Sequence, residues 1–479
     1  MKIKNMKKSI IFLALIVATS GCKSLENNEA TNLLDTTQDC SAPLGLELDE
    51  GKAIYNLTSA CLFQNQTHFI KIKVLGETFQ KILADGCADI ESGYGHLIEM
   101  NFNGIKIPDV GIKVRGNSSR CNEKRQFKFK FDLKKAFSKF NGVTEEKLFE
   151  LGDRRFYGVE GFSLRASLND TSMIRERLSS ELFHRASIGS GPVRGAPVYR
   201  TAFSKLFVSY DRKESEGPEG NFNRLFEGIY YDYKGIYTLT ENIDRIFIES
   251  RYQNGSEKIK SSLVQADLGK GYFSDGGYEK LGFDFEFYKG KKLKEEQEVE
   301  AYRLIDDLSD FLRTDPTESE ISRVLDVDAF INYTVAAHLT GHWDSILTNG
   351  NNDYLFYDLN TLKWQPVTWD LDNTFGIIDH EYQMRMSANI YTAAKLQKNQ
   401  LFEKLFKPEN QNIRQKLRSR FKEVFETNLS ESALKKLIEK YAHQLNEATE
   451  DFETVDSRKF EELSNFYQTK KKEIEAQIP

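Results

Sequence analysis

The segment from His342 to Gly376 mixes acidic and amide side chains with large aromatic ones, and this mixture limits what the chain can fold into. It runs "HWDSILTNGNNDYLFYDLNTLKWQPVTWDLDNTFG". Carboxylate and amide groups buried beside Trp and Tyr are unfavourable unless hydrogen bonds or a cation compensate them. The segment therefore predicts a polar site within a folded domain, and a metal ion bound to phosphates is one cation that could occupy it.

Length and composition indicate a large globular protein. The chain has 479 residues, of which 39% are hydrophobic and 12% aromatic, so it can bury a substantial core in one large domain or two. Its formal net charge is -6, with 66 Lys and Arg residues against 72 Asp and Glu residues. Because the basic residues are dispersed among the acids, we expect no nucleic-acid partner.

The N-terminus has the pattern of an export signal, which we assign to residues 1–21. An apolar run from Ile10 to Ala18, too short to span a bilayer, follows a cluster of lysines: Lys2, Lys4, Lys7 and Lys8. The sequence "TSGC" resembles a bacterial lipobox, which makes Cys22 a candidate for lipidation. Thr19 stands where Leu is usual, so an ordinary secreted protein is the alternative. We expect residues 22–50 to tether an exported protein to a membrane of the cell envelope.

Four further cysteines are expected to form disulfides. An even number of cysteines in an exported chain favours two disulfides, and no His stands at zinc-finger spacing. The sequence does not choose among the three possible pairings of Cys40, Cys61, Cys87 and Cys121.

The N-terminal third of the mature chain predicts β-structure. Alternating runs between residues 67 and 115 indicate strands, and "RGNSS" at residues 115–119 predicts a turn between two of them. In the next run, "RQFKFKFDLKK", Phe127, Phe129 and Phe131 fall on one face. This pattern predicts an amphipathic strand whose opposite face presents Lys128 and Lys130. The simplest interpretation of these lysines is a solvated face.

A helix is predicted within "NDTSMIRERLSSELFHRAS", residues 169–187. Capping residues open the segment, and Ile174, Leu178 and Leu182 repeat every four residues. Glu181 lies beside this apolar stripe, whereas Glu176 is expected to point elsewhere. We therefore predict Glu181 as the inward-facing acid.

Later segments predict further strands and then mostly helices. Residues 196–210 and 226–244 are typical of strands, and residues 291–341 have helical periodicity. From residue 397 onward, amphipathic helices rich in Lys and Glu dominate. No internal repeat is present.

The order of these features matches that of a protein kinase. A turn between strands, a strand with Lys, a helix with an inward Glu, His-x-Asp-x4-Asn and a final Asp-x-Asp follow one another. In this order Asp344 would accept the proton of the attacking hydroxyl. Asn349 and Asp370 would hold Mg²⁺ or Mn²⁺ on ATP. Each motif alone is weak, but their joint order is specific.

The motifs "RGNSSRCNEKRQFKFKF", "SMIRERLSSELF", "GIYTLTENID" and "NNDYLFYDLNTLKWQPVTWDLDNTFG" together resemble the CotH kinase family of secreted or surface atypical kinases. The resemblance implies an α+β, divergent kinase-like fold with a β-rich N-terminal lobe and a mainly helical C-terminal lobe. We assign the kinase-like domain to residues 51–400, with lobes at about 60–245 and 246–400. Residues 401–479 would form a helical extension.

The same resemblance implies phosphate transfer from ATP to Ser or Thr hydroxyls of a protein. A Lys of "KFKF" would contact the phosphates; Lys130, deeper in the strand, is favoured over Lys128. Asp372 would either share the metal or cap a turn. The predicted nucleotide site is completed by the turn and the helix: Arg115, Asn117, Ser118 and Glu181. The chain lacks the G-x-G-x-x-G and V-A-I-K motifs of ordinary protein kinases.

Two other functions compete with the kinase. A catalytically silent surface or coat protein, or an adhesin, could use the same scaffold, because a fold does not determine a function. A metal-assisted hydrolase would also use paired carboxylates, but it does not explain the lysine strand or the kinase-like order. The sequence does not identify the acceptor or the source of ATP outside the cytoplasm.

Overall fold

The structure is a computed structural model. It describes residues 47–49, 52–54, 59–63, 66–89, 93–116, 118–134, 144–188, 198–210, 223–252, 261–266, 283–287, 295–348, 352–358, 361–376, 389–392, 400–449 and 455–478.

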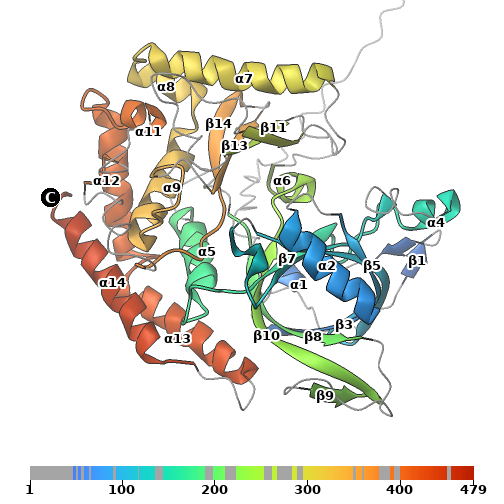
Figure 1. The fold of residues 1–479 in the computed structure, drawn as a ribbon. Coiled ribbons are helices and arrows are strands. Elements are labelled where there is room, and N and C mark those ends of the chain that lie inside the picture. The colour runs from blue at the N-terminus through green and yellow to red at the C-terminus, as the bar shows by residue number, and fades with distance from the viewer. Residues whose placement is uncertain are drawn as a thin grey trace, which may run out of the picture.

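A β-barrel forms the N-terminal lobe (Figure 1). Within the described residues the sheet has the order β7-β6-β5-β4-β3-β8-β10-β9, and it closes because β7 also pairs with β10. Strands β3 and β8 are parallel, and the other neighbouring strands are antiparallel. The strands are β3 (Thr67–Lys73), β4 (Gly95–Phe102), β5 (Ile105–Arg115), β6 (Gln126–Lys130), β7 (Gly161–Arg165), β8 (Thr201–Ser209), β9 (Asn223–Phe226) and β10 (Ile229–Glu241).

The alternating run at residues 126–130 is confirmed as a strand. Phe127 and Phe129 of β6 are buried, as is Phe131 directly after it, while Lys128 and Lys130 are only partly buried. The three phenylalanines belong to the apolar core of the barrel. The period of two therefore identified correctly which face of this strand lies inside.

Helix α2 (Gly76–Ala88) covers the barrel (Figure 1) and lies within residues 67–115, where only strands were predicted. Its buried positions, Phe79, Ile82 and Gly86, follow a helical spacing between two strongly alternating strands. A Cβ on Gly86 would lie 2.5 Å from Cβ of Val114, so only glycine allows this close approach of α2 to β5.

Short elements accompany the barrel. They are β1 (Glu47–Asp49), which pairs with β2 (Lys52–Ile54), α1 (Ser59–Leu62), η2 (Ser118–Cys121), α4 (Glu145–Glu150) and α6 (Arg245–Tyr252). Strand β5 ends at Arg115 and β6 begins at Gln126, so "RGNSS" does start a connection between two strands.

The C-terminal lobe combines a small antiparallel sheet with helices. The strand order is β12-β11-β13-β14. Its members are β11 (Ser261–Ala266), β12 (Phe283–Phe287), β13 (Asp353–Asp358) and β14 (Lys363–Thr368). The helices before β13 are α5 (Arg175–Ala186), α7 (Glu295–Arg313), α8 (Glu318–Val324) and α9 (Val327–Thr340).

Helix α9 lies at the centre of this lobe. All of its residues except Asp328 are buried, and it packs against α5, α12, α14 and β14. Asp326 caps its N-terminus by accepting a hydrogen bond from Ala329 N at 3.1 Å. Gly341 ends the helix with φ 62°, and a Cβ there would lie 2.5 Å from the Phe466 ring. The chain therefore turns sharply into the His342 segment.

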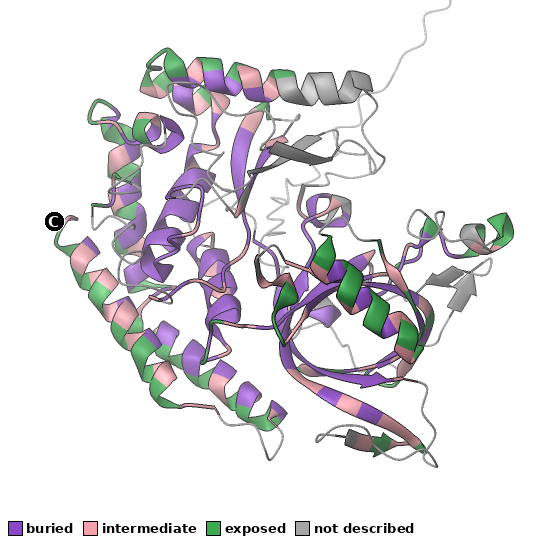
Figure 2. Cartoon of the chain, in the orientation of Figure 1, coloured by how far each residue is buried: buried purple, intermediate pink, exposed green. Residues whose placement is uncertain are grey.

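Four C-terminal helices complete the lobe: α11 (Gln400–Leu405), α12 (Gln411–Glu426), α13 (Glu431–Ala448) and α14 (Arg458–Glu475). Figure 2 shows buried residues on their inner sides and exposed residues on their outer sides, as the amphipathic pattern predicts. They share one apolar core with α5 and α9. The predicted fold class, α+β with a β-rich N-terminal lobe and a mainly helical C-terminal lobe, is confirmed.

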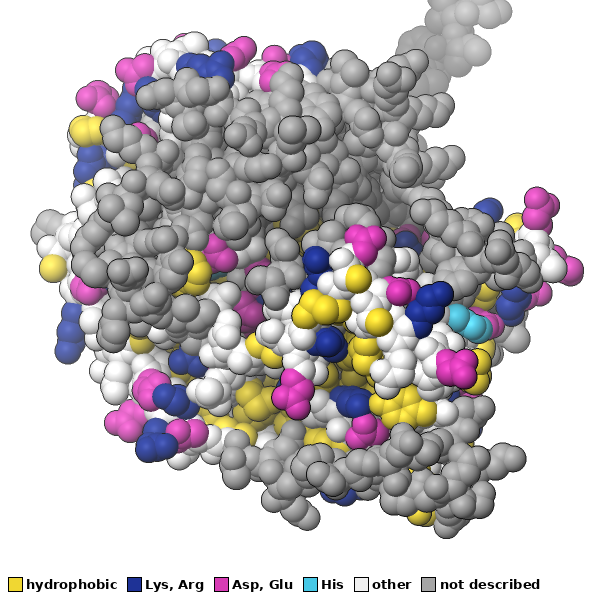
Figure 3. Space-filling model, viewed as in Figure 1, with side chains coloured by type: hydrophobic (Ala, Val, Ile, Leu, Met, Phe, Trp, Pro, Cys, Tyr) yellow, Lys and Arg dark blue, Asp and Glu magenta, His cyan; other side chains and the backbone are white. Residues whose placement is uncertain are grey.

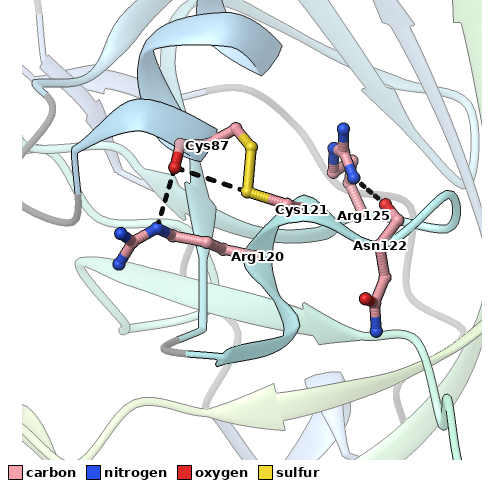
Figure 4. Close-up of a disulfide and its surroundings, with 5 residues drawn as sticks. All are labelled: Cys87, Arg120, Cys121, Asn122 and Arg125. Atoms are coloured by element: carbon pink, nitrogen blue, oxygen red, sulfur yellow. Dashed lines mark hydrogen bonds between the residues drawn. A yellow bond between two sulfur atoms is a disulfide. The ribbon is translucent and has the colours of Figure 1, made fainter.

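A disulfide joins Cys87, in the last turn of α2, to Cys121 in η2 (Figure 4). Beside it, Arg120 Nε donates a hydrogen bond to the Cys87 carbonyl at 3.1 Å. Cys61 is also disulfide-bonded. Cys40, the lipidation candidate Cys22 and the predicted leader lie outside the described residues. Across the described part of the chain, no helix is both long enough and apolar enough to cross a membrane.

Candidate functional site

Arg165, the last residue of β7, is the centre of a buried ionic cluster. Its side chain is 3% exposed, and its Nε lies 2.9 Å from Oε1 of Glu176. Its Nη2 lies 3.0 Å from Oδ2 of Asp372 and also forms an ion pair with Asp370. Burial alone would lower the pKa of Arg165, but the three carboxylates raise it well above its ordinary value. Arg165 is therefore held as a buried cation.

Glu176 reaches this cluster from the first turn of α5. Its Oε1 also accepts a hydrogen bond from the Tyr199 hydroxyl at 2.8 Å, and that hydroxyl accepts one from Leu371 N at 3.1 Å. Tyr199 therefore connects α5 to the segment that carries Asp370. Asp170 anchors the start of α5 by accepting a hydrogen bond from Arg175 N at 2.8 Å.

The prediction that Glu181 faces inward and Glu176 points elsewhere is wrong. Glu181 pairs with Arg185 Nε at 2.8 Å along the same helix, and its side chain is 12% exposed against 1% for Glu176. The error arose because the helix was assigned a single apolar stripe. In the structure α5 contacts β8, α9 and α13, so most of its circumference is buried, including this acid in the first turn.

Asp370 and Asp372 follow β14 directly. Asp370 adopts a left-handed conformation, φ 59°, which is uncommon for a residue with a Cβ and is often found at functional sites. Two hydrogen bonds hold the segment in place: Phe375 N donates to Thr340 O at 2.7 Å, and the hydroxyls of Ser179 and Thr374 lie 2.7 Å apart. The segment is thus attached to both α9 and α5.

The two carboxylates of this pair titrate differently. Burial raises the pKa of Asp372 well above its ordinary value, as does the neighbouring Asp370. Burial would also raise the pKa of Asp370, but Arg165 and Arg115 lower it overall. Oδ1 of Asp372 is buried and has no hydrogen-bond partner within the described residues. Negative charge is therefore in excess here, and a cation would relieve it.

Arg115, predicted to bind the nucleotide, is brought to the same cluster from the end of β5. Its Cζ lies 5.1 Å from the centroid of the Trp369 ring, and its Nη1 is a buried donor without a hydrogen-bond partner in the described structure. Burial lowers its pKa, and so does the nearby Arg165. A buried unpaired guanidinium nitrogen beside a carboxylate pair suits a ligand with phosphate groups and a bound cation.

Asp344, the predicted base, lies in the segment after α9, next to the Asp370 segment. The hydrogen bond between Thr340 and Phe375 joins these two segments, and Asn352 Nδ2 donates to Oδ2 of Asp344 at 2.7 Å. Its neighbour His342 is buried, and burial lowers its pKa to about 4 although Asp370 acts in the opposite direction. His342 is therefore neutral near pH 7.

The strand register distinguishes the two candidate lysines. Lys128 pairs with Ser163, two residues from Arg165, whereas Lys130 pairs with Gly161 and lies 6.0 Å from the Tyr94 ring. Burial and Glu160 raise the pKa of Asp244 to about 7, and the positive charge of Lys128 acts in the opposite direction. Lys128 is therefore close enough to Asp244 to influence its charge. The geometry thus favours Lys128 as the lysine nearer the cluster, contrary to our preference from the sequence. Asn117, Asn349 and the side chain of Ser118 are outside what the structure describes.

The residues present fit a magnesium ion. Among the described residues no set of three or more His, Cys, Asp or Glu side chains is arranged to hold a metal. Mg²⁺, however, usually takes only one or two protein carboxylates, and water and phosphate oxygens supply the rest. Asp370 and Asp372 can provide two such carboxylates, and the unpaired Oδ1 of Asp372 is consistent with this role.

Sequence reasoning missed Arg165, Glu176 and Tyr199. One local signal was available: "GFSLR" is an apolar strand that ends in Arg, and a charged residue at the end of a fully buried strand needs a partner. Nothing local identified that partner, because Asp370 lies 205 residues further along the chain.

Comparisons with known proteins agree on one family. The family described as "CotH kinase protein" matches residues 112–476. Invasin CotH3 of Rhizopus delemar is 26% identical over 241 residues, which cover 47% of this chain and 33% of that protein. Invasin CotH2 of the same organism is 25% identical over 230 residues, or 45% of this chain and 32% of that protein. The match therefore spans about a third of the length of each relative.

Proposed function

Because this chain belongs to the CotH kinase protein family, we propose that it transfers phosphate from ATP to Ser or Thr hydroxyls of a secreted or envelope protein. One observation supports this proposal most directly. A basic side chain on a barrel strand, Arg165, pairs with an acid on α5 beside the Asp370 and Asp372 carboxylates. Protein kinases join a strand lysine, a helix glutamate and a metal-binding aspartate in the same way.

In this proposal each part of the cluster has one task. Arg165 and Arg115 provide positive charge for phosphate oxygens, and Glu176 with Tyr199 keeps Arg165 in place. Asp370 and Asp372, with Asn349, would hold the Mg²⁺, which offsets phosphate charge when bound. An arginine in place of the usual lysine offers several donors, so it can contact carboxylates and phosphate together.

Asp344 is the candidate base. It would accept the proton of the acceptor hydroxyl, and its hydrogen bond from Asn352 keeps the carboxylate oriented. His342 is unsuited to this role because its ring is buried and neutral.

A surface-binding function is the second candidate, because both Rhizopus relatives are named invasins. The two functions differ in one measurable property. A kinase binds Mg-ATP and transfers phosphate, whereas a protein that acts only by adhesion does neither.

The deciding experiment is transfer of labelled phosphate from ATP by the purified mature chain with Mg²⁺ or Mn²⁺. We expect Asp370→Ala to abolish both nucleotide binding and transfer. Asp344→Asn should still bind nucleotide but should transfer phosphate about 10²–10⁴ times more slowly than wild type. Asp310→Asn, on the exposed side of α7, is the matched control and should behave as wild type. Wild-type protein that neither binds Mg-ATP nor transfers phosphate would rule out the kinase.

We also propose that the protein is exported and anchored by lipid on Cys22. Cys22→Ser should move it from the membrane fraction to the soluble fraction after signal cleavage. A Cys22→Ser protein that is processed and still sediments with membranes would show that another anchor exists.

A further inference from the structure

One large cavity formed by the described residues lies apart from the ionic cluster. It measures about 1100 Å³ and opens at one mouth of the barrel, between α2, β6, β10, the connection from β7 to α5, and the start of α14. Ala166 lines this cavity, whereas its neighbour Arg165 points into the ionic cluster. The cavity and the cluster therefore lie on opposite sides of the same short segment.

The floor of the cavity is apolar. Phe79 and Leu83 of α2 face Phe127 and Tyr237 of the barrel, and Met173 closes one side. Phe79 and Leu83 precede residue 112, where the family match begins, so part of this floor lies outside the matched region. Apolar floors in the mouths of β-barrels are common places for ligands to bind.

The rim of the cavity is mainly basic. It has five cationic side chains, Lys124, Arg125, Lys234, Arg458 and Lys459, against three acidic ones, Glu123, Asp170 and Asp456. Asp170 is already committed to Arg175 and the start of α5. The chain as a whole has a net charge of -6, so this mouth is a local exception. Figure 3 shows apolar side chains beside basic ones in the centre of this face.

All five rim cations already have partners. Lys124 donates a hydrogen bond to the Ile236 carbonyl, Arg125 donates one to the Asn122 carbonyl, and Lys234 pairs with Asp232. The other two form exposed surface pairs. Arg458 pairs with Asp456 at 2.9 Å, and Lys459 with Glu462 at 2.6 Å. Arg458 is 84% exposed, and an exposed pair of this kind contributes little to stability because water screens it. A carboxylate-bearing ligand could therefore compete for these cations.

We propose that the barrel mouth is a second binding site, and that it takes an acidic peptide segment carrying at least one large apolar side chain. The apolar side chain would fill the floor between Phe79 and Tyr237, and flanking carboxylates would meet the basic rim. A concave site of this volume suits a peptide better than a flat anionic bilayer, which binds protruding basic and apolar groups.

A peptide bound there would contact the segment that organises the ionic cluster. Residues 166–173 line the mouth in part, and this connection joins Arg165 on β7 to Glu176 on α5. Asp170 connects the cavity with α5, because it lines the mouth and also accepts the hydrogen bond that anchors the start of the helix. The binding site itself does not depend on the proposed kinase activity.

The test is direct binding to the full mature chain, measured by fluorescence polarisation with three labelled hexapeptides: Glu-Glu-Leu-Phe-Glu-Glu, Glu-Glu-Ser-Ser-Glu-Glu and Lys-Lys-Leu-Phe-Lys-Lys. We expect only the first to bind appreciably. The double variant Arg458→Glu with Lys459→Glu should raise its Kd at least tenfold, which corresponds to about 1.4 kcal/mol. Leu83→Gln should also raise the Kd, with a melting temperature close to wild type.

The matched control places the same charge changes on α13, with Lys435→Glu and Lys436→Glu, both exposed and outside the mouth. It should leave the Kd unchanged. Equal weakening by control and test variants, or equal binding of all three peptides, would overturn the proposal. Competition by Mg-ATP would identify the mouth as a nucleotide site. Binding to phosphatidylserine vesicles that depends on Arg458 and Lys459, without peptide binding, would identify a membrane surface.

Discussion

Arg165 depends on its carboxylate partners to remain buried. A guanidinium in an apolar interior is unfavourable unless several acceptors surround it, and Glu176, Asp370 and Asp372 supply them from two distant parts of the chain. The arrangement joins β7, α5 and the segment after β14 through one side chain. Loss of any one partner should therefore affect the fold and the proposed activity together.

Glu176→Gln tests this dependence, with Glu181→Gln as the matched control on the same helix. We expect Glu176→Gln to lower the free energy of unfolding by about 1–3 kcal/mol, because it weakens the charge-assisted contact with Arg165 Nε while Asp370 and Asp372 still pair with Arg165. Glu181→Gln, which breaks only an i,i+4 pair with Arg185, should cost about 0.5 kcal/mol or less. Urea unfolding measures both values. Equal losses would contradict the assignment of Glu176 as the acid in the cluster.

At the scale of elements, the disulfide between Cys87 and Cys121 restrains the connection from β5 to β6. It ties the end of α2 to η2, six residues beyond Arg115, and Arg120 adds a hydrogen bond to the Cys87 carbonyl. The position of Arg115 in the ionic cluster thus depends on an element outside the cluster.

The double variant Cys87→Ser with Cys121→Ser tests this restraint. We expect it to lower the free energy of unfolding by about 2–4 kcal/mol, because the disulfide closes a loop with a sequence separation of 34 residues. We also expect weaker Mg-ATP binding, since Arg115 follows directly from the restrained connection. Unfolding curves and nucleotide titrations provide the two readouts. An unchanged unfolding midpoint would mean that the disulfide contributes no stability.

At the scale of the whole molecule, buried titratable groups determine the response to acid. Burial lowers the pKa of His68 to about 4, of His338 to about 3 and of His342 to about 4, from an ordinary 6.5. Burial would raise the pKa of Glu241, but Arg200 and Arg251 lower it to about 2. Asp244 acts in the opposite sense, because burial and Glu160 raise its pKa to about 7.

We expect the free energy of unfolding to fall as the pH drops from 6.5 to 4. In that window the unfolded chain protonates its histidines while the folded chain keeps three of them neutral, so unfolding takes up protons. Each such histidine adds a slope of up to about 1.4 kcal/mol per pH unit, partly offset by Asp244. Urea unfolding at a series of pH values measures the profile. A free energy of unfolding that stays constant between pH 6.5 and 4 would contradict this prediction.

Below pH 4.5 the loss should continue, because the depressed pKa of Glu241 stabilises the fold above that pH and this contribution disappears between pH 4.5 and about 2. The variant Glu241→Gln should be less stable than wild type at pH 7 and should lose less of its stability in this lower window.

Features with a short sequence period could be predicted. The alternation at Phe127, Phe129 and Phe131 identified a strand and its inner face, and the amphipathic C-terminal segments identified helices. The neighbouring acids Asp370 and Asp372 were recognised because the polar residues of one short segment are visible together. Arg115, predicted from the sequence to bind the nucleotide, lies at the end of its strand beside the Trp369 ring, and its role in nucleotide binding stays a prediction.

The features that could be predicted are therefore those controlled by spacing along the chain: the helices and strands, their buried faces and the local acid pair. Which distant residues complete the site depends on how the helices and strands pack together. Arg165, Glu176 and Tyr199 come together because the barrel closes and α5 is enclosed by β8, α9 and α13. Enclosure on several sides buries residues that a single-stripe pattern leaves exposed, so Glu176 rather than Glu181 reaches Arg165. The physical reason is that a buried charge is compensated by whichever opposite charge the packing brings within contact, whatever its distance along the chain.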